Sequence, residues 1–360
     1  MRKKLRGRSA GGTIGSDVFD SLPDDLVISI LCKLSSTASS PSELIVVLLT
    51  CKRLNKLGLD PLVLSKACSK TLSIRANKWC DGAHRFLKLC VKAGNIEAYY
   101  TLGMIRFYCL ESRGNGASLI ARAAIKSHAL AFYSLALIQF NGSGALKNDD
   151  KDLRAGVALC ARSAYLGHVD ALRELGHCLQ DGYGVQKNIT EGRRLLVQAN
   201  VRELASPLQI FNKTQPRPMV KNKTDFNNYD LFTDYGFHLT GQEIHPANNF
   251  MVEWFGSRED STLGPQGLKM CSYKGCGRPE TRKNEFRTCS GCGKVKYCSR
   301  GCQAHDWRVC HKVDCAPMEE WVGHAINDLA DEEDIINDDN VAIDDQTNET
   351  RQEAVEEILV

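Results

Sequence analysis

Half of this chain's cysteines crowd into one short segment, from Cys271 to Cys315. The 360 residues hold 16 cysteines, and eight of them fall within this eighth of the chain. The other eight are scattered among apolar residues, as buried thiols are in a reducing compartment. The crowded segment itself has too few apolar residues to form a core. Such a cluster predicts a metal site rather than a disulfide framework.

Eight side chains in this segment have the spacing of zinc ligands. They are Cys271, Cys276, Cys289, Cys292, Cys298, Cys302, His311 and Cys315. Structural zinc is held by four Cys or His ligands, so eight ligands make two complete sets with no open coordination position. We therefore expect two structural zinc ions and no activated water. Ligands with three residues between them should lie one turn apart on a helix, which applies to Cys298 with Cys302 and to His311 with Cys315.

The run resembles a MYND finger, including the stretch 296–303 and the tryptophan Trp307. The resemblance implies that the two ligand sets interleave. One zinc would then be bound by Cys271, Cys276, Cys298 and Cys302, and the other by Cys289, Cys292, His311 and Cys315. The resemblance also implies that short proline-containing peptides bind beside Gln303 and Trp307. The alternative for Trp307 is a place in the core of the finger.

One spacing departs from the MYND pattern. Eight residues separate Cys302 from His311 where the family usually has seven, and Cys310 occupies the usual ligand position. We favour His311 because its spacing from Cys315 keeps both ligands on one helix face. Cys310 is then a spare thiol. His305 is out of register with the ligands and is expected at the surface.

Residues 18–70 predict a small helical domain. Apolar residues recur at Leu26, Ile30 and Leu34 after Pro23, which is helical spacing. A second helix is expected to start with Ser42 as its cap, and Asp60-Pro61 marks a third turn.

This segment resembles an F-box, from the stretch 19–26 to Asp60-Pro61. The resemblance implies a three-helix unit that docks on the Skp adaptor of a cullin-based ubiquitin ligase. The contact residues it implies are Leu22, Pro23, Leu26, Ile30 and Leu31. The alternative is a helical cap on the domain that follows.

Residues 84–204 contain a repeat with anchor alanines at Ala98, Ala131 and Ala171, spaced 33 and 40 residues apart. A leucine follows each alanine by four residues, and the last two units run into turns at Gly142 and Gly182. Such periods predict paired helices stacked as an α-solenoid, with small residues letting the helices approach closely. The pattern resembles Sel-one-like repeats, relatives of the tetratricopeptide repeat. The resemblance implies that the concave face binds proteins; the alternative is a spacer.

The remaining segments are poorer in pattern. Residues 205–268 read as a linker with short helices, one of them at 248–255, and its aromatic residues suggest packing on the solenoid. These aromatic residues are Phe232, Tyr235, Phe237 and Trp254. Residues 1–17 form a basic arm, and the acidic tail at 328–360 is expected to be disordered. The longest apolar run, 44–51, is far shorter than the roughly 20 residues of a membrane-spanning helix.

The predicted fold is therefore mostly α-helical: an F-box unit, an α-solenoid, the MYND finger at 269–316 and an acidic tail. This order resembles a family of plant F-box proteins with Sel-one-like repeats and a C-terminal MYND finger. The resemblance implies a non-catalytic substrate-recognition adaptor of a Skp–cullin–F-box ubiquitin ligase, with a protein substrate or a proline-containing peptide as further partner. The sequence contains neither a phosphate-binding glycine loop nor a nucleophile elbow, the motifs that would indicate an enzyme.

The alternative function is a transcriptional or chromatin scaffold without a ligase role. The finger has 11 basic and four acidic residues from Lys269 to Cys315, but its thiolates and zinc ions reduce that formal charge from +7 to +4. No helix has base-reading spacing, so we do not expect nucleic acid as a partner. A direct ubiquitin ligase is disfavoured because the first ligand pair does not have RING spacing. We expect the protein in the nucleus, the cytoplasm or both.

Overall fold

The computed structural model describes residues 21–144, 151–214, 244–257 and 267–316, without the side chains of 204–214. The predicted basic arm 1–17, the acidic tail 328–360 and the aromatics Phe232, Tyr235 and Phe237 lie outside these residues. None of the described helices combines the length and apolar character that crossing a bilayer requires.

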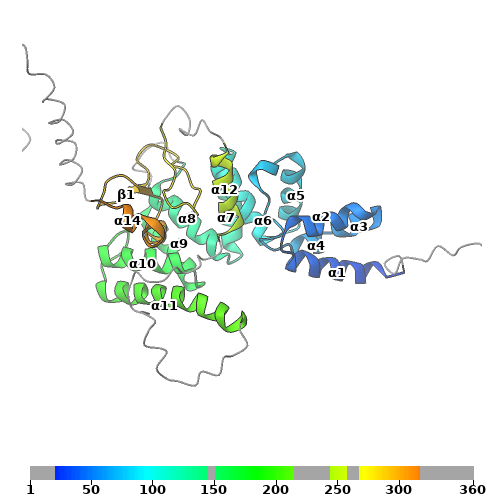
Figure 1. Cartoon of the computed structure of the whole chain (residues 1–360), viewed down its shortest axis with the longest axis horizontal. Coiled ribbons are helices and arrows are strands. Elements are labelled where there is room, and N and C mark those ends of the chain that lie inside the picture. The colour runs from blue at the N-terminus through cyan, green and yellow to red at the C-terminus, as the bar shows by residue number, and fades with distance from the viewer. Residues whose placement is uncertain (1–20, 145–150, 215–243, 258–266, 317–360) are drawn as a thin grey trace, which may run out of the picture. The chain divides into compact units, whose positions relative to one another are not determined.

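Four short helices form the N-terminal domain (Figure 1), one more than predicted. They are α1 (Asp24–Thr37), α2 (Pro41–Thr50), α3 (Lys52–Gly58) and α4 (Pro61–Ser65). Val27 and Leu31 of α1 pack against Leu44, Leu48 and Val63 in a common core. An N-terminal core of this kind holds α1 in place by burying one apolar stripe of the helix.

The ends of these helices follow from local chemistry. Asp60 caps α4 by accepting a hydrogen bond from the Leu62 amide at 2.8 Å, as the Asp-Pro pair predicts. The expected cap at Ser42 is wrong, because α2 begins at Pro41 and Ser40 occupies the capping position. Proline suits the first helical position, since its missing amide hydrogen has no partner there anyway.

Seven further helices form the repeats. They are α5 (Asp81–Lys92), α6 (Ile96–Met104), α7 (Arg113–Ile125), α8 (Ala129–Asn141), α9 (Leu153–Tyr165), α10 (Val169–Asp181) and α11 (Ile189–Thr214). A 3-10 turn η1 (Ala76–Lys78) precedes them, and a π-helical turn η2 (Ile105–Cys109) extends α6. The anchor alanines begin α6, α8 and α10 as predicted, and each is fully buried. Successive helices lie side by side, as Figure 1 shows for α10 and α11.

Glycine allows the closest approaches between paired helices. A Cβ added to Gly116 of α7 would lie 2.8 Å from the carbonyl oxygen of Gly103 in α6. The same arrangement recurs in the last pair of helices, where a Cβ on Gly192 of α11 would lie 2.6 Å from the Gly176 oxygen of α10. The predicted role of small residues at these crossings is therefore confirmed.

The first helix of each repeat starts with the same cap. Asn95 accepts a hydrogen bond from the Ala98 amide, and His128 and His168 accept from Ala131 and Ala171 through Nδ1. Each capping histidine ring also lies against a tyrosine of the preceding repeat, with centroids 4.8 Å apart for Tyr100–His128. These caps satisfy amides that would otherwise lack a partner at the helix start.

Helix α12 (Pro246–Gly256) lies in the predicted linker and packs on the start of the solenoid, against η1, α6 and η2. It confirms the helix expected at 248–255. His245 caps it by accepting from Ala247, and Glu253 pairs with Arg75 and accepts from the Ala76 amide. The linker is also shorter than expected, because α11 continues past residue 204 to Thr214.

The finger has little regular structure. A two-stranded antiparallel sheet pairs β1 (Arg287–Thr288) with β2 (Lys296–Tyr297). Helix α13 (Arg300–Asp306), the π-helical turn η6 (Trp307–His311) and α14 (Lys312–Asp314) follow. The large buried side chains of this module are few, with Phe286 and Tyr297 the bulkiest.

Replacing Glu97 with glutamine should make the free energy of unfolding less dependent on pH below about pH 5. The carboxylate of Glu97 accepts hydrogen bonds from Nε2 of His128 at 3.2 Å and of His245 at 3.3 Å, so it ties α12 to the repeats. Burial raises the pKa of Glu97, but the two histidines outweigh burial and hold the pKa below its usual value. The stabilisation is therefore present above the ordinary pKa of 4.5 and is lost as the pH falls through the lower folded-state pKa.

Urea unfolding of both proteins between pH 7 and pH 3 checks this expectation. The wild type should lose more unfolding free energy below pH 5 than Glu97→Gln does. Glu191→Gln is the matched control, since Glu191 forms an exposed pair with Arg194 on one helix and should change the profile much less. Parallel curves for wild type and Glu97→Gln would contradict the assignment.

Candidate metal centre

The first four predicted ligands meet in one buried cluster. The sulphur atoms of Cys271, Cys276, Cys298 and Cys302 all lie within 4.8 Å of one another. Sγ of Cys298 is 3.5 Å from the sulphurs of Cys276 and Cys302. All four side chains are less than a tenth exposed. This is the interleaved set that the MYND resemblance implies.

The other four ligands also gather, with Cys289, Cys292 and His311 buried and Cys315 half-buried. Their ligand atoms lie within 4.8 Å of one another. Both groups fit zinc by the chemistry of their donors: seven soft thiols and one imidazole, in two sets of four. When bound, zinc would supply cross-links to a segment with few large buried side chains.

The electrostatics of the first cluster also suit a cation. Hydrogen bonds from the neighbouring thiols, together with the nearby Arg278, lower the pKa of Cys276 well below its usual value. Burial raises the pKa of Cys271 well above its usual value. Thiols in contact cannot all ionise without a positive charge between them, because the thiolates would repel one another in a buried site.

Both uncertain ligand candidates fall outside the two clusters. Sγ of Cys310 donates to Asp306 at 3.3 Å, while His311 joins the second ligand set. His305 was expected at the surface, but its Nε2 lies 2.9 Å from the Asp170 carboxylate of α10. The longer spacing before His311 is therefore accommodated by the π-helical turn η6, which contains one extra residue per turn.

The expected helical step for Cys298 and Cys302 is wrong. Cys298 directly follows strand β2, and Ser299 caps α13 by accepting from the Cys302 amide at 3.0 Å. A capping residue has extended backbone, so Cys298 reaches the cluster from a strand and Cys302 from the first helical turn. Gln303 and Trp307, the predicted peptide-binding residues, are both half-buried, and the Trp307 ring lies edge-on to His311 at 5.8 Å.

The finger is seated on the first helices of the repeats. Arg278 is 5% exposed, and its Nη2 donates to Ser134 of α8 at 3.0 Å while Nη1 lies 3.7 Å from the Cys276 sulphur. Asn141 at the end of α8 donates to the carbonyl oxygen of Cys298 at 2.9 Å. One arginine thus links the metal cluster directly to the solenoid.

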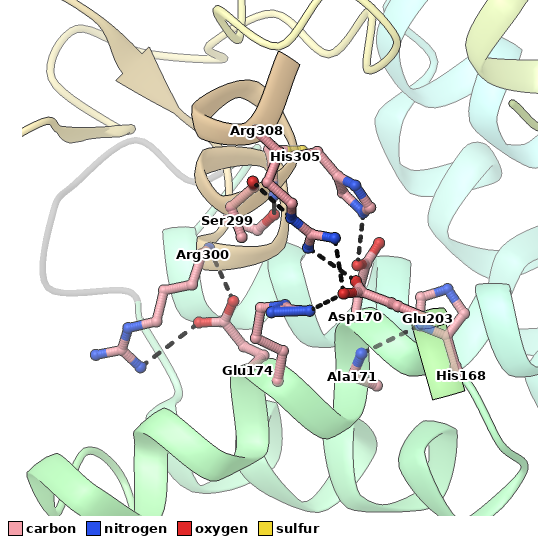
Figure 2. Close-up of polar contacts among 12 residues, drawn as sticks. His168, Asp170, Ala171, Glu174, Glu203, Ser299, Arg300, His305 and Arg308 are labelled. Atoms are coloured by element: carbon pink, nitrogen blue, oxygen red, sulfur yellow. Dashed lines mark hydrogen bonds and ion pairs between the residues drawn. The ribbon is translucent and has the colours of Figure 1, made fainter. Parts of the chain in front are cut away.

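Helix α13 docks on α10 through charged side chains (Figure 2). The Arg300 amide donates to Glu174 at 2.9 Å, and the Arg300 guanidinium also pairs with Glu174 and Asp181. His305 points toward Asp170 in the same view. Burial raises the pKa of Tyr133, which packs beside this contact against Gly301. The contact is polar, and its Arg300–Glu174 pair is largely buried.

A second part of the contact involves α11. Glu203 accepts from Arg308 of the finger at 2.8 Å and pairs with Arg173 of α10. Asp170, Glu203 and His305 come within 4.8 Å of one another, a distance that would also suit a metal ion. Two arginines already neutralise Glu203, so an ion-pair network explains this group.

Sequence reasoning missed this seat, although one signal was present. At the two positions after Leu172 the third repeat has Arg173 and Glu174, where the second has Tyr133 and Ser134. Charged side chains so close to a buried anchor alanine are almost always paired. Arg173 and Glu174 therefore indicated that this face of α10 has a charged partner, but they did not indicate which segment of the chain supplies it.

The N-terminal helices expose large apolar side chains. Leu26 and Ile30, two predicted adaptor contacts, are 49% and 48% exposed, and Pro23 is exposed while Leu22 is half-buried. The prediction for Leu31 needs correction, because that side chain is 2% exposed and packs in the domain core. Helix α1 has two apolar stripes one residue apart, and Leu31 belongs to the inner one.

Comparison with known proteins agrees with this architecture. The MYND finger model matches residues 271–315, and a model described as plant tetratrico peptide repeats matches residues 70–165. The F-box protein At1g67340 of Arabidopsis thaliana is 60% identical over 318 residues, which cover 86% of this chain and 83% of that protein. This chain belongs to the same family of F-box proteins.

A second member of this F-box family, F-box protein At5g50450 of Arabidopsis thaliana, is 59% identical over 90% of this chain and 93% of its own length. The finger alone is similar to MYND-type zinc finger protein samB of Aspergillus oryzae, with 38% identity over 58 residues, 16% of this chain and 9% of that protein. The F-box family assignment therefore extends over most of the chain, and the fungal similarity covers the finger.

Proposed function

We propose that this F-box protein is the substrate-recognition adaptor of a Skp–cullin–F-box ubiquitin ligase. The observation that carries the proposal is the exposed apolar face of the N-terminal helices. Six large apolar side chains there are between 42% and 76% exposed: Leu26, Ile30, Ile45, Val46, Leu49 and Leu62. Several large apolar side chains exposed on one small domain are typical of a protein interface.

The finger supports a binding role rather than a catalytic one. Its two four-ligand sets leave no position for an activated water, and we infer that two zinc ions occupy them. Its own residues hold the finger against the repeats through Arg278, Arg300 and Arg308. The adaptor would therefore present finger and repeats to a substrate as one surface, while the N-terminal helices bind the ligase.

A double substitution, Leu26→Asp with Ile30→Asp, tests the proposal. Burying two unpaired carboxylates in an apolar interface should weaken binding to a Skp adaptor by at least about tenfold. Pull-down and titration calorimetry with purified Skp adaptor measure it. Leu166→Asp is the matched control, since Leu166 is 40% exposed but lies in the repeats. Absence of Skp binding by the wild type would overturn the proposal and favour a scaffold without a ligase role.

A further inference from the structure

The second helices of the repeats carry large apolar side chains that are exposed to solvent. Ile125 of α7 and Tyr165 of α9 are 82% and 85% exposed, and Val201 of α11 is 58% exposed. Each follows by two residues a buried small side chain, at Ala123, Ser163 and Ala199. The three therefore occupy equivalent positions of successive repeats. We call them the outer ladder.

Contacts between repeats align the ladder along one edge. Lys126, next to Ile125, donates from Nζ to the carbonyl oxygen of Gly94 in the preceding loop at 3.0 Å. One repeat later, Ser163 donates to the carbonyl oxygen of Ala129 at 2.8 Å. At the third, Nη1 of Arg202 lies 3.6 Å from where a Cβ of Gly167 would be. Each second helix thus ends beside the loop before it, and the apolar side chains follow one another from repeat to repeat.

The first two ladder residues, Ile125 and Tyr165, lie on helices rich in basic residues. Residues 113–127 and 153–167, which include α7 and α9, contain five basic and no acidic residues: Arg113, Arg122, Lys126, Arg154 and Arg162. Arg122 lies over the Tyr99 ring at 4.6 Å, and Arg162 over Phe132 at 6.0 Å. Such stacking holds the two guanidinium groups at equivalent positions of successive repeats. Within the described part of the chain, Arg122, Lys126 and Arg162 form no salt bridge.

The inner face of the repeats is already occupied by this chain. Ser134 and Glu174, on α8 and α10, bind Arg278 and Arg300 of the finger, and Glu97 of α6 binds the cap of α12. Ser134 and Glu174 are buried beneath the finger, so an incoming segment cannot reach them while the finger is in place. In the outer layer, Ile125 and Tyr165 are more than four-fifths exposed, and Arg122 and Lys126 donate to uncharged oxygens, those of the Tyr99 hydroxyl and the Gly94 carbonyl.

We propose that the outer ladder binds an acidic segment of a partner protein that carries apolar residues at intervals. Carboxylates would pair with Arg122, Lys126 and Arg162, and the apolar residues would cover Ile125, Tyr165 and Val201. The inference deepens the proposed function by naming the surface and chemistry of the substrate, and it rests on that function only in calling the partner a substrate.

Fluorescence anisotropy with the full-length, zinc-loaded chain tests the proposal. The probe is a labelled 12-residue peptide with three copies of Asp-Leu-Glu-Ile. Two reference peptides replace either its acids by lysine or its apolar residues by glycine and serine. We expect saturable binding of the acidic–apolar peptide, at least tenfold tighter than either reference, and at least fivefold weaker when salt rises from 0.1 to 0.5 M, since exposed charges are screened.

Ile125→Asp with Tyr165→Asp should weaken this binding at least tenfold. Both side chains are exposed, so the variant should fold, and unchanged circular dichroism and zinc content check that. Leu49→Asp is the matched control, because Leu49 is 76% exposed on the N-terminal domain and should leave peptide binding unchanged. Equal peptide binding by the ladder variant and wild type, or no preference over the reference peptides, would overturn the proposal.

Two further measurements distinguish this inference from nucleic-acid binding and from the proposed adaptor role. A 12-nucleotide single-stranded RNA that binds tighter than the peptide and displaces it would reassign the surface to nucleic acid, and so overturn the proposal. Skp binding is measured on the same samples. Loss of peptide binding with intact Skp binding in the ladder variant supports the ladder, whereas a wild type that binds peptide but not Skp overturns only the adaptor role.

Discussion

Replacing Cys276 with serine should unfold the finger and free it from the repeats. Cys276 is 1% exposed and contributes to both the first ligand set and the environment of Arg278. Structural zinc in small fingers contributes roughly 10–16 kcal/mol to folding, far more than the few large buried side chains here can replace. The substitution also removes the Cys276 sulphur beside Arg278, so a finger that stayed folded would keep this buried guanidinium with one partner fewer.

Zinc analysis and limited proteolysis measure this effect. The wild type should bind about two zinc ions per chain, as two four-ligand sites require, and the variant one or none. The variant should also be cut rapidly within residues 267–316, and the amides of α8 and α10 should exchange faster once uncovered. Cys310→Ser is the matched control, because Cys310 lies in the same module outside both ligand sets. Full zinc content in Cys276→Ser, or its loss in Cys310→Ser, would contradict the ligand assignment.

Replacing Gly116 with valine should destabilise the repeats more than any surface change. A Cβ at this position would lie 2.6 Å from the amide nitrogen of Phe107 and 2.8 Å from the oxygen of Gly103. Both contacts are with backbone, so no side-chain rotation relieves them and α6 must move away from α7. We expect a loss of about 3 kcal/mol or more in unfolding free energy, and a midpoint roughly 6 °C lower or more.

Thermal unfolding followed by circular dichroism measures this loss. Gly114→Val is the matched control, because it lies in the same helix and a Cβ there would meet nothing within 4 Å. Valine is also a somewhat better helix former than glycine, so the control should be neutral or slightly stabilising. Similar midpoints for the two variants would show that the helices are not in the close contact described.

The features predictable from the sequence are those with local spacing. The metal ligands recur at short intervals, so spacing identified the eight candidates, whereas their division into two interleaved sets came from the MYND resemblance. The anchor alanines Ala98, Ala131 and Ala171 were equally clear, because each repeat buries its own helix start in the same way. Helix α12 was also found, since a proline and an apolar run mark it.

The contacts between modules were not predictable. Arg278 and Ser134 lie 144 residues apart, and the Arg300 amide is 126 residues from Glu174, so no period connects them. The error at Leu31 has a related cause. Spacing shows that α1 has apolar stripes, but it cannot show which stripe faces the core, and the inner one proved to contain Val27 and Leu31.

The arginine contacts between the finger and the repeats make the boundary at residue 269 a poor place to divide the protein. Cutting there would strip Arg278, Arg300 and Arg308 of the Ser134, Glu174 and Glu203 acceptors that they reach in the intact chain. The excised module would then display three cations that normally face inward, and acidic molecules would adhere to it for that reason alone. Ligands selected with the isolated finger would therefore report on a surface that the intact protein keeps closed.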